Sequence, residues 1–228
     1  MWIIMVMLLF GLFPAGCGKK YEEASVTTAT VSDETEEESS KHEMVLETET
    51  ETEKEEETEP EERVEVDGKI QSYLTGEMVD VKQGNRRPLA VMMSNDKASL
   101  PQYGINRAAV VYEAPVEGDM NRYMALIEDY DDLERIGSVR SCRTYYTYFA
   151  REFDAVYAHF GQSNFAEPYL KNVDNINGID GIGSTAFYRS SDKKAPHNAY
   201  TSGSRITKAI ETLKYRTDYE ESYDGHFK

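Results

Sequence analysis

Hydrophobic positions divide the chain into three regions. Residues 1–13 form an uncharged apolar run, residues 21–63 contain few large apolar side chains, and apolar residues become frequent again from Val64 onward. In this last region, short apolar runs bounded by polar or glycine residues predict buried strands. These strands are expected at residues 89–93, 108–112, 122–127 and 155–160.

Apolar residues three and four positions apart predict helices between and after these strands. One helix is expected to run from an N-cap at Ser141 to about Phe153, a short one over residues 164–172, and a third around residues 206–213. The first helix would bury one face, which carries Cys142, Tyr145, Tyr146, Phe149 and Phe153. Strands and helices mixed in this way predict an α/β or α+β fold, a single domain with a mixed β-sheet and flanking helices.

The N-terminal apolar run is typical of the core of a signal peptide. It is shorter than the roughly 20 residues that cross a bilayer. Pro14-Ala15-Gly16 precede Cys17, and small residues before a cysteine resemble the lipobox of bacterial lipoproteins, where the cysteine is acylated and the chain is cut before it. We therefore expect a lipoprotein signal peptide at residues 1–16 and fatty acids such as palmitate on Cys17. An ordinary cleaved signal peptide or an uncleaved anchor helix are the alternatives.

Charge is concentrated in the segment that follows. Residues 21–63 carry 18 acidic and 3 basic side chains, and the whole chain has a formal net charge of −17. Such a segment cannot bury enough apolar surface to offset its chain entropy, so residues 17–63 are predicted to be a disordered Thr/Glu-rich tether. The remaining 165 residues carry 24 acidic and 20 basic side chains. Without a basic surplus, no nucleic-acid partner is expected, and without a second apolar run a polytopic membrane protein is excluded.

Several motifs beyond residue 70 resemble the YerB-like lipoproteins, a family whose N-terminal domain has no known function. They occur in the family's order and cover roughly residues 70–205: Arg87-Pro88-Leu89-Ala90-Val91, Leu100-Pro101-Gln102-Tyr103-Gly104, Ile136-Gly137-Ser138-Val139-Arg140-Ser141, His159-Phe160-Gly161 and Ala195-Pro196-His197-Asn198. The resemblance implies a membrane-attached protein on the extracytoplasmic face of the cell membrane. It also implies a second, C-terminal domain, so the domain at 64–228 is expected to be truncated before it.

Candidate binding residues lie where predicted strands and helices begin or end, or in the loops between them. No nucleophile elbow, zinc-protease, P-loop or dinucleotide motif is present, and no cofactor is expected. Ligands of α/β sheets gather beyond the carboxyl ends of strands, and arginines at a helix start can bind an anion. The candidate ligand-binding residues are Arg140, Ser141, Arg143, Glu113, Arg122, Arg189 and Asn198. Alternatively, Arg140 and Arg143 pair with surface carboxylates.

A catalytic interpretation rests on Glu117, His159 and His197. Two imidazoles and one carboxylate suit zinc, so these residues could serve a cell-envelope hydrolase, with or without metal. For His159, a hydrogen-bonded core position in a strand is the competing interpretation. Cys142, in an apolar helix-periodic stretch, is interpreted as a packed thiol.

The sequence thus favours a membrane-anchored lipoprotein that contacts the bilayer through acylated Cys17. Its most favoured role is a binding or scaffold module for an anionic cell-envelope component or a membrane-protein partner. The envelope hydrolase is the alternative, and whether the chain is an enzyme stays open.

Overall fold

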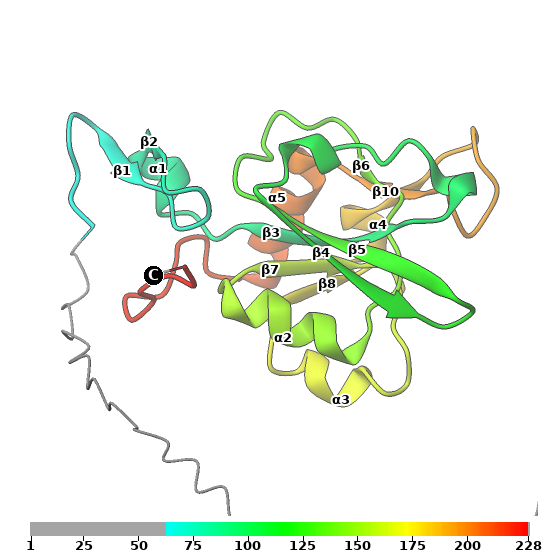
Figure 1. Ribbon diagram of the computed structural model, residues 1–228. Coiled ribbons are helices and arrows are strands. Elements are labelled where there is room, and N and C mark those ends of the chain that lie inside the picture. The colour runs from blue at the N-terminus through cyan, green and yellow to red at the C-terminus, as the bar shows by residue number, and fades with distance from the viewer. Residues whose placement is uncertain (1–62, 228) are drawn as a thin grey trace, which may run out of the picture. The chain divides into compact units, whose positions relative to one another are not determined.

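The fold is built on a five-stranded mixed sheet, seen in a computed structural model that describes residues 63–227 (Figure 1). The strands lie in the order β4-β5-β3-β7-β8. Strand β3 is antiparallel to β5 and parallel to β7, while β4 pairs antiparallel with β5, and β8 parallel with β7. Their bounds are β3 (Leu89–Ser94), β4 (Val110–Val116), β5 (Met120–Ile127), β7 (Val156–His159) and β8 (Asn175–Asn177).

This arrangement confirms the predicted mixed sheet with flanking helices. The predicted strands at 89–93, 122–127 and 155–160 match β3, β5 and β7, and the strand expected at 108–112 begins later and runs further, as β4. The expected signal peptide, Cys17 and the tether up to residue 62 lie outside the described residues.

Helices on both faces explain why β3 is buried along its whole length (Figure 1). Alternate residues of a strand point to opposite faces. Leu89, Val91 and Met93 belong to the apolar cluster that includes residues of α5 (Gly203–Leu213). Ala90 and Met92 belong to a second cluster, with residues of α2 (Thr144–Glu152) and α3 (Glu167–Leu170). The sheet is therefore the middle layer between two apolar clusters.

Smaller elements complete the domain. Strands β6, β10 and β9 form a three-stranded sheet in that order, and α4 directly precedes β9 in the chain. A β1-β2 hairpin followed by α1 precedes the central sheet, and two 3-10 turns follow β3. Their bounds are β1 (Lys69–Gln71), β2 (Met78–Asp80), α1 (Val81–Gly84), η1 (Lys97–Ser99), η2 (Ile105–Arg107), β6 (Ile136–Gly137), α4 (Gly183–Ala186), β9 (Tyr188–Arg189) and β10 (Ala199–Thr201). No helix among residues 63–227 is both long and apolar enough to span a bilayer.

The helix predicted to start at Ser141 begins instead at Thr144. Arg143 occupies its N-cap position without a side-chain cap, and the Ser141 hydroxyl donates to the Phe160 carbonyl at 3.1 Å. The reason is that residues 138–142 are held extended between the diverging ends of β3 and β7. The Arg140 amide donates to the Met92 carbonyl at 2.9 Å, and the Phe160 amide donates to the Arg140 carbonyl at 2.9 Å. The prediction of Ser141 as N-cap is therefore wrong.

The end of β6 directs this extended segment. Gly137 has a φ of 126°, a conformation that L side chains rarely adopt, and an added Cβ would lie 2.7 Å from the Val139 amide nitrogen. Gly137 also pairs with both Tyr103 and Tyr200. Glycine here lets the chain leave β6 and enter the space beside β3.

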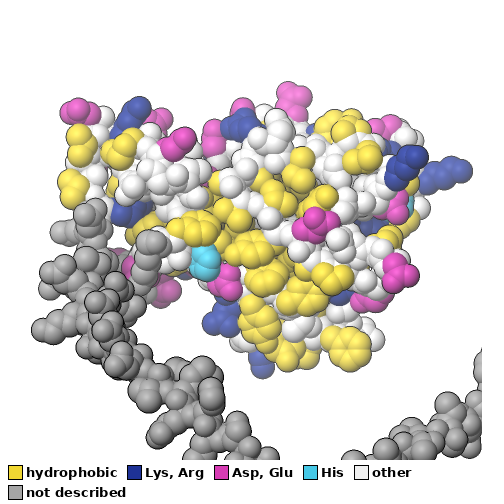
Figure 2. Space-filling model, in the orientation of Figure 1, with side chains coloured by type: hydrophobic (Ala, Val, Ile, Leu, Met, Phe, Trp, Pro, Cys, Tyr) yellow, Lys and Arg dark blue, Asp and Glu magenta, His cyan; other side chains and the backbone are white. Residues whose placement is uncertain are grey.

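The predicted apolar face of α2 is largely confirmed. Tyr146 and Phe153 are fully buried, and Tyr145 and Phe149 pack against the same cluster. Cys142, just before the helix, is fully buried as a free thiol, as predicted. The helix predicted at 164–172 is confined to the four residues of α3. Figure 2 shows hydrophobic side chains gathered over the α2–α3 side of the molecule, where Tyr148 and Phe165 are exposed.

Candidate functional site

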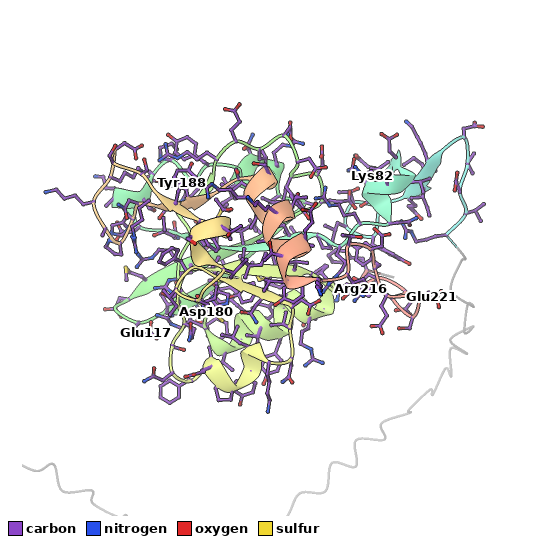
Figure 3. All side chains as sticks on the ribbon, turned by 180° about the vertical axis from the view of Figure 1, so that it is seen from behind. Lys82, Glu117, Asp180, Tyr188, Arg216 and Glu221 are labelled. Atoms are coloured by element: carbon purple, nitrogen blue, oxygen red, sulfur yellow. The ribbon has the colours of Figure 1, made fainter. Side chains whose placement is uncertain are left out.

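Two cavities lie at opposite ends of the central sheet. The larger one, about 510 Å³, lies at the amino ends of β3, β7 and β8. Four of its charged lining residues pair with one another: Arg87 contacts Asp174 at 2.6 Å and Asp154 at 3.3 Å, and Arg216 contacts Asp154 at 2.7 Å. Figure 3 shows Arg216 at the end of the domain away from Glu117. We interpret this network as structural, since it ties the last described segment to the sheet.

The smaller cavity, about 200 Å³, lies at the carboxyl edge of the sheet. It is formed where β3 and β4 end, where β5 begins, and by the two loops that carry Arg140 and His197. The lining residues are Ser94, Asp96, Val116, Met120, Asn121, Arg122, Arg140, Pro196 and His197. Three residues singled out from the sequence, Arg122, Arg140 and His197, thus meet at one place, the edge where ligands of such sheets gather.

Arg122 is the most buried cation of this cavity, with 6% of its surface exposed. Its Nη1 donates to the Ser141 carbonyl at 2.5 Å. No carboxylate among the described residues forms an ion pair with it. Burial, together with repulsion from Arg143 and Arg140, lowers the pKa of Arg122 to about 10, while the charge of Glu117 acts in the opposite sense. A buried cation without a carboxylate partner costs folding free energy, and an anion in the cavity would offset that cost.

Arg140 supplies a second guanidinium from a rigid backbone. Its Nη1 donates to the Pro196 carbonyl at 2.8 Å, and its own backbone bonds to Met92 and Phe160 on either side. Burial is the largest cause of a lowered pKa of Arg140, and repulsion from Arg143 and Arg189 adds to it, while Asp96 acts in the opposite sense. Like Arg122, it forms no ion pair with a described carboxylate.

His197 adds a polar group to the same lining. Its Nδ1 is buried and has no hydrogen-bond partner among residues 63–227. A buried ring nitrogen without a partner is costly and calls for a ligand atom or water. Two guanidiniums and one imidazole can together hold a single carboxylate or phosphate group.

The other predicted binding residues are occupied elsewhere. The Nε of Arg143 donates to both carboxylate oxygens of Glu117, at 2.8 and 2.9 Å, and its Nη2 also bonds to that carboxylate. This ion pair lowers the pKa of Glu117. For Arg143, the interpretation as a surface ion pair therefore describes the structure. Neither residue lines the cavity.

Glu113, Arg189, Asn198 and Ser141 also lie outside the lining of the cavity. Glu113 accepts hydrogen bonds from the Asn121 and Asn95 side chains, at 2.8 and 3.1 Å. Arg189 donates to the Asn198 side chain at 2.6 Å. Ser141 contributes through its carbonyl, which accepts the hydrogen bond that fixes Arg122.

The structure does not bring Glu117, His159 and His197 together. His159 is fully buried in β7, where Nδ1 lies 2.8 Å from the Gly161 carbonyl and Nε2 lies 3.2 Å from the Asn175 side-chain oxygen. Burial lowers the pKa of His159. Glu117 lies on the exposed turn between β4 and β5 (Figure 3). Within residues 63–227, no three His, Cys, Asp or Glu side chains are grouped to hold a metal.

Sequence reasoning missed most of the cavity wall. Ser94 and Asp96, which follow closely after the strand expected at 89–93, and Met120 and Asn121 in the β4–β5 turn are not among the candidate residues. The position of Ser94 and Asp96, directly after the most apolar strand, could have indicated them, because such positions form the ligand-binding edge of α/β sheets. The residues of the β4–β5 turn gave no such signal.

Comparisons with known proteins agree with this architecture. Residues 74–216 match the family described as "Protein of unknown function (DUF3048) N-terminal domain". A protein of Bacillus subtilis (strain 168) named "Putative lipoprotein YerB" is 37% identical over 154 residues, which cover 67% of this chain and 46% of that protein. The crystal structure of YerB from Bacillus subtilis superposes with a TM-score of 0.61 at 35% identity, covering 66% of this chain and 52% of the other. The chain therefore spans about half the length of the curated relative that it matches.

Proposed function

Because the chain belongs to the DUF3048 family and carries its N-terminal domain, we propose that it is a membrane-anchored lipoprotein whose folded domain binds an anionic component of the cell envelope. Two features support the anchor: the relative's name, which is that of a lipoprotein, and the small residues before Cys17. Two acyl chains hold a protein stably on a bilayer, where one chain alone is marginal. In this proposal the acidic tether presents the domain on the extracytoplasmic face.

A single observation carries the binding function: Arg122 and Arg140 line one cavity, and neither forms an ion pair with a described carboxylate. Most arginines buried in a fold are paired. In this protein, Arg87 shows the structural pattern, since it contacts both Asp154 and Asp174. In this proposal Arg87 stabilises the fold through its ion pairs, whereas Arg122 is available to bind a ligand.

Titration calorimetry tests the proposal with simple anions. The full chain, solubilised in a nonionic detergent, is titrated with propionate and separately with inorganic phosphate. We expect saturable binding of one anion per chain for at least one of them, and a loss of about tenfold or more in affinity for Arg140→Ala. Arg107→Ala is the matched control, because Arg107 is already paired with Asp129 and Asp132 away from the cavity. Absence of saturable binding by either anion would contradict the proposal.

A further inference from the structure

The geometry of the same cavity points to a narrower class of ligand. We propose that it binds a small zwitterion, with a carboxylate held by Arg122 and Arg140 and an ammonium group held by Asp96; this inference rests on the proposed function. Among the described residues that line the cavity, Asp96 is the one with an acidic side chain. The two arginines and this aspartate give the cavity both signs of charge.

A hydrogen bond holds the Asp96 side chain in position, and its carboxylate can still accept further hydrogen bonds. One of its carboxylate oxygens accepts a hydrogen bond from the Ala98 amide at 2.7 Å, which caps the 3-10 turn η1. A carboxylate has about four lone-pair sites, so the capping bond leaves others for a ligand. Among the described residues Asp96 forms no ion pair.

Asp96 and Arg140 are near each other but do not touch. The charge of Asp96 partly opposes the lowering of the Arg140 pKa, although no nitrogen of Arg140 lies within 4.0 Å of the Asp96 carboxylate. The two opposite charges line one cavity but do not form an ion pair with each other. A molecule that lies between them can therefore contact both. A ligand that carries both a carboxylate and an ammonium group would form one ion pair with Arg140 and another with Asp96.

The aspartate in the lining favours a singly charged carboxylate over a phosphate dianion. A dianion beside Asp96 is repelled by that carboxylate, and the repulsion is strong where water is partly excluded. Drug-sized ligands occupy cavities of about 300–1,000 Å³. At about 200 Å³ the present cavity suits a molecule of amino-acid size. Val116, Met120 and Pro196 add an apolar part to the lining, against which a short aliphatic side chain could pack.

The test uses four probes with the full chain in detergent: alanine, propionate, which lacks the ammonium group, ethylamine, which lacks the carboxylate, and inorganic phosphate. We expect alanine to bind at least about tenfold more tightly than each of the other three, since only alanine completes both ion pairs. Asp96→Asn is the discriminating variant, because asparagine can still cap η1. In this variant alanine should lose its advantage over propionate.

The outcomes separate the two proposals. If propionate or phosphate binds as tightly as alanine, or if Asp96→Asn leaves the preference for alanine unchanged, the zwitterion inference is wrong and anion binding stands. If neither propionate nor phosphate binds saturably, anion binding fails, and the inference that rests on it fails as well. Circular dichroism of Asp96→Asn, compared with the unsubstituted chain, shows whether the variant is folded.

Discussion

Arg122 lies directly opposite Ser94 in the antiparallel pairing of β5 with β3, and both residues line the cavity at the carboxyl edge of the sheet. The pairing places a buried guanidinium beside the end of β3, a strand that is buried along its whole length. The same edge receives Arg140 from the extended segment between β3 and β7. The cavity therefore depends on the register between β3 and β5 and on the separation of β3 from β7 near their carboxyl ends.

Removing the charge of Arg122 should stabilise the fold while it abolishes anion binding. Arg122→Met relieves the burial cost and the repulsion from Arg140 and Arg143 that lower the pKa of this residue to about 10. We expect the free energy of unfolding to rise by about 2 kcal/mol, within the range found when buried charged groups are replaced by apolar groups of similar volume. Urea denaturation of the full chain measures this change.

The matched control for that prediction is Arg107→Met, which removes a partly exposed cation paired with Asp129 and Asp132. Because surface ion pairs contribute little, its effect on unfolding should stay within about 1 kcal/mol. A marked loss of stability in Arg122→Met would mean that Arg122 serves the fold and would weaken its assignment to a ligand.

The Glu117–Arg143 ion pair should make stability depend weakly on acid pH. Arg143 lowers the pKa of Glu117 below its ordinary value of 4.5, so the folded state favours the ionised carboxylate. The contribution is present above pH 4.5 and is lost as the pH falls through the lower folded-state value. Since the Glu117 side chain is 67% exposed, we expect less than about 1 kcal/mol.

Urea denaturation of Glu117→Gln across that pH range checks the prediction. The variant should be less stable than the unsubstituted chain at neutral pH, and the difference should shrink on acidification. A difference that grows as the pH falls would contradict the assigned ion pair. Unchanged anion binding in the variant is also expected, because Glu117 does not line the cavity.

Cys142 should be unreactive in the folded protein. Its side chain is fully buried, and burial raises the pKa of its thiol to about 11. The thiolate is the reactive form, so a chromogenic disulfide reagent at mildly alkaline pH should modify Cys142 only after unfolding. The measurement uses Cys17→Ala to leave Cys142 as the single cysteine. Rapid modification without denaturant would show that the thiol is accessible.

Acylation at Cys17 remains a prediction, since this residue lies outside the described part of the chain. Cells that express the protein are fed an alkyne-bearing palmitate analogue, and the label on the purified chain is read by fluorescence. We expect Cys17→Ala to lose the label and Cys142→Ala to keep it, because Cys142 is buried. Equal labelling of the unsubstituted chain and Cys17→Ala would contradict the lipoprotein assignment.

The sequence predicted those elements whose local pattern and tertiary environment agree. The residues of β3 are apolar on both faces, and helices cover both faces of that strand. The start of α2 was misplaced because Cys142 continues the helical spacing, whereas its amide bonds to the Gly161 carbonyl at 2.9 Å as part of an extended segment. A contact between residues far apart in the chain overrides periodicity, and a single sequence does not reveal such a contact.

The site was predicted only in part for a similar reason. Arg122, Arg140 and His197 were identified by residue type and by their place at element ends, yet their convergence depends on the β3–β5 register and on the loop that carries Pro196. Strands of two or three residues, such as β6, β8 and β10, are too short to produce a periodic pattern. The small β6-β10-β9 sheet and the edge strand β8 could therefore not be placed from the sequence.

Nuclear magnetic resonance of the arginine side chains tests anion binding at this cavity most directly. The Nε–H signals of the isotope-labelled full chain in detergent micelles are assigned with Arg→Lys variants and followed during titration with propionate. The account predicts that the signals of Arg122 and Arg140 shift together and saturate with one dissociation constant, while those of Arg87 and Arg107 stay in place. Unchanged signals for Arg122 and Arg140, or equal shifts at all four arginines, would contradict it.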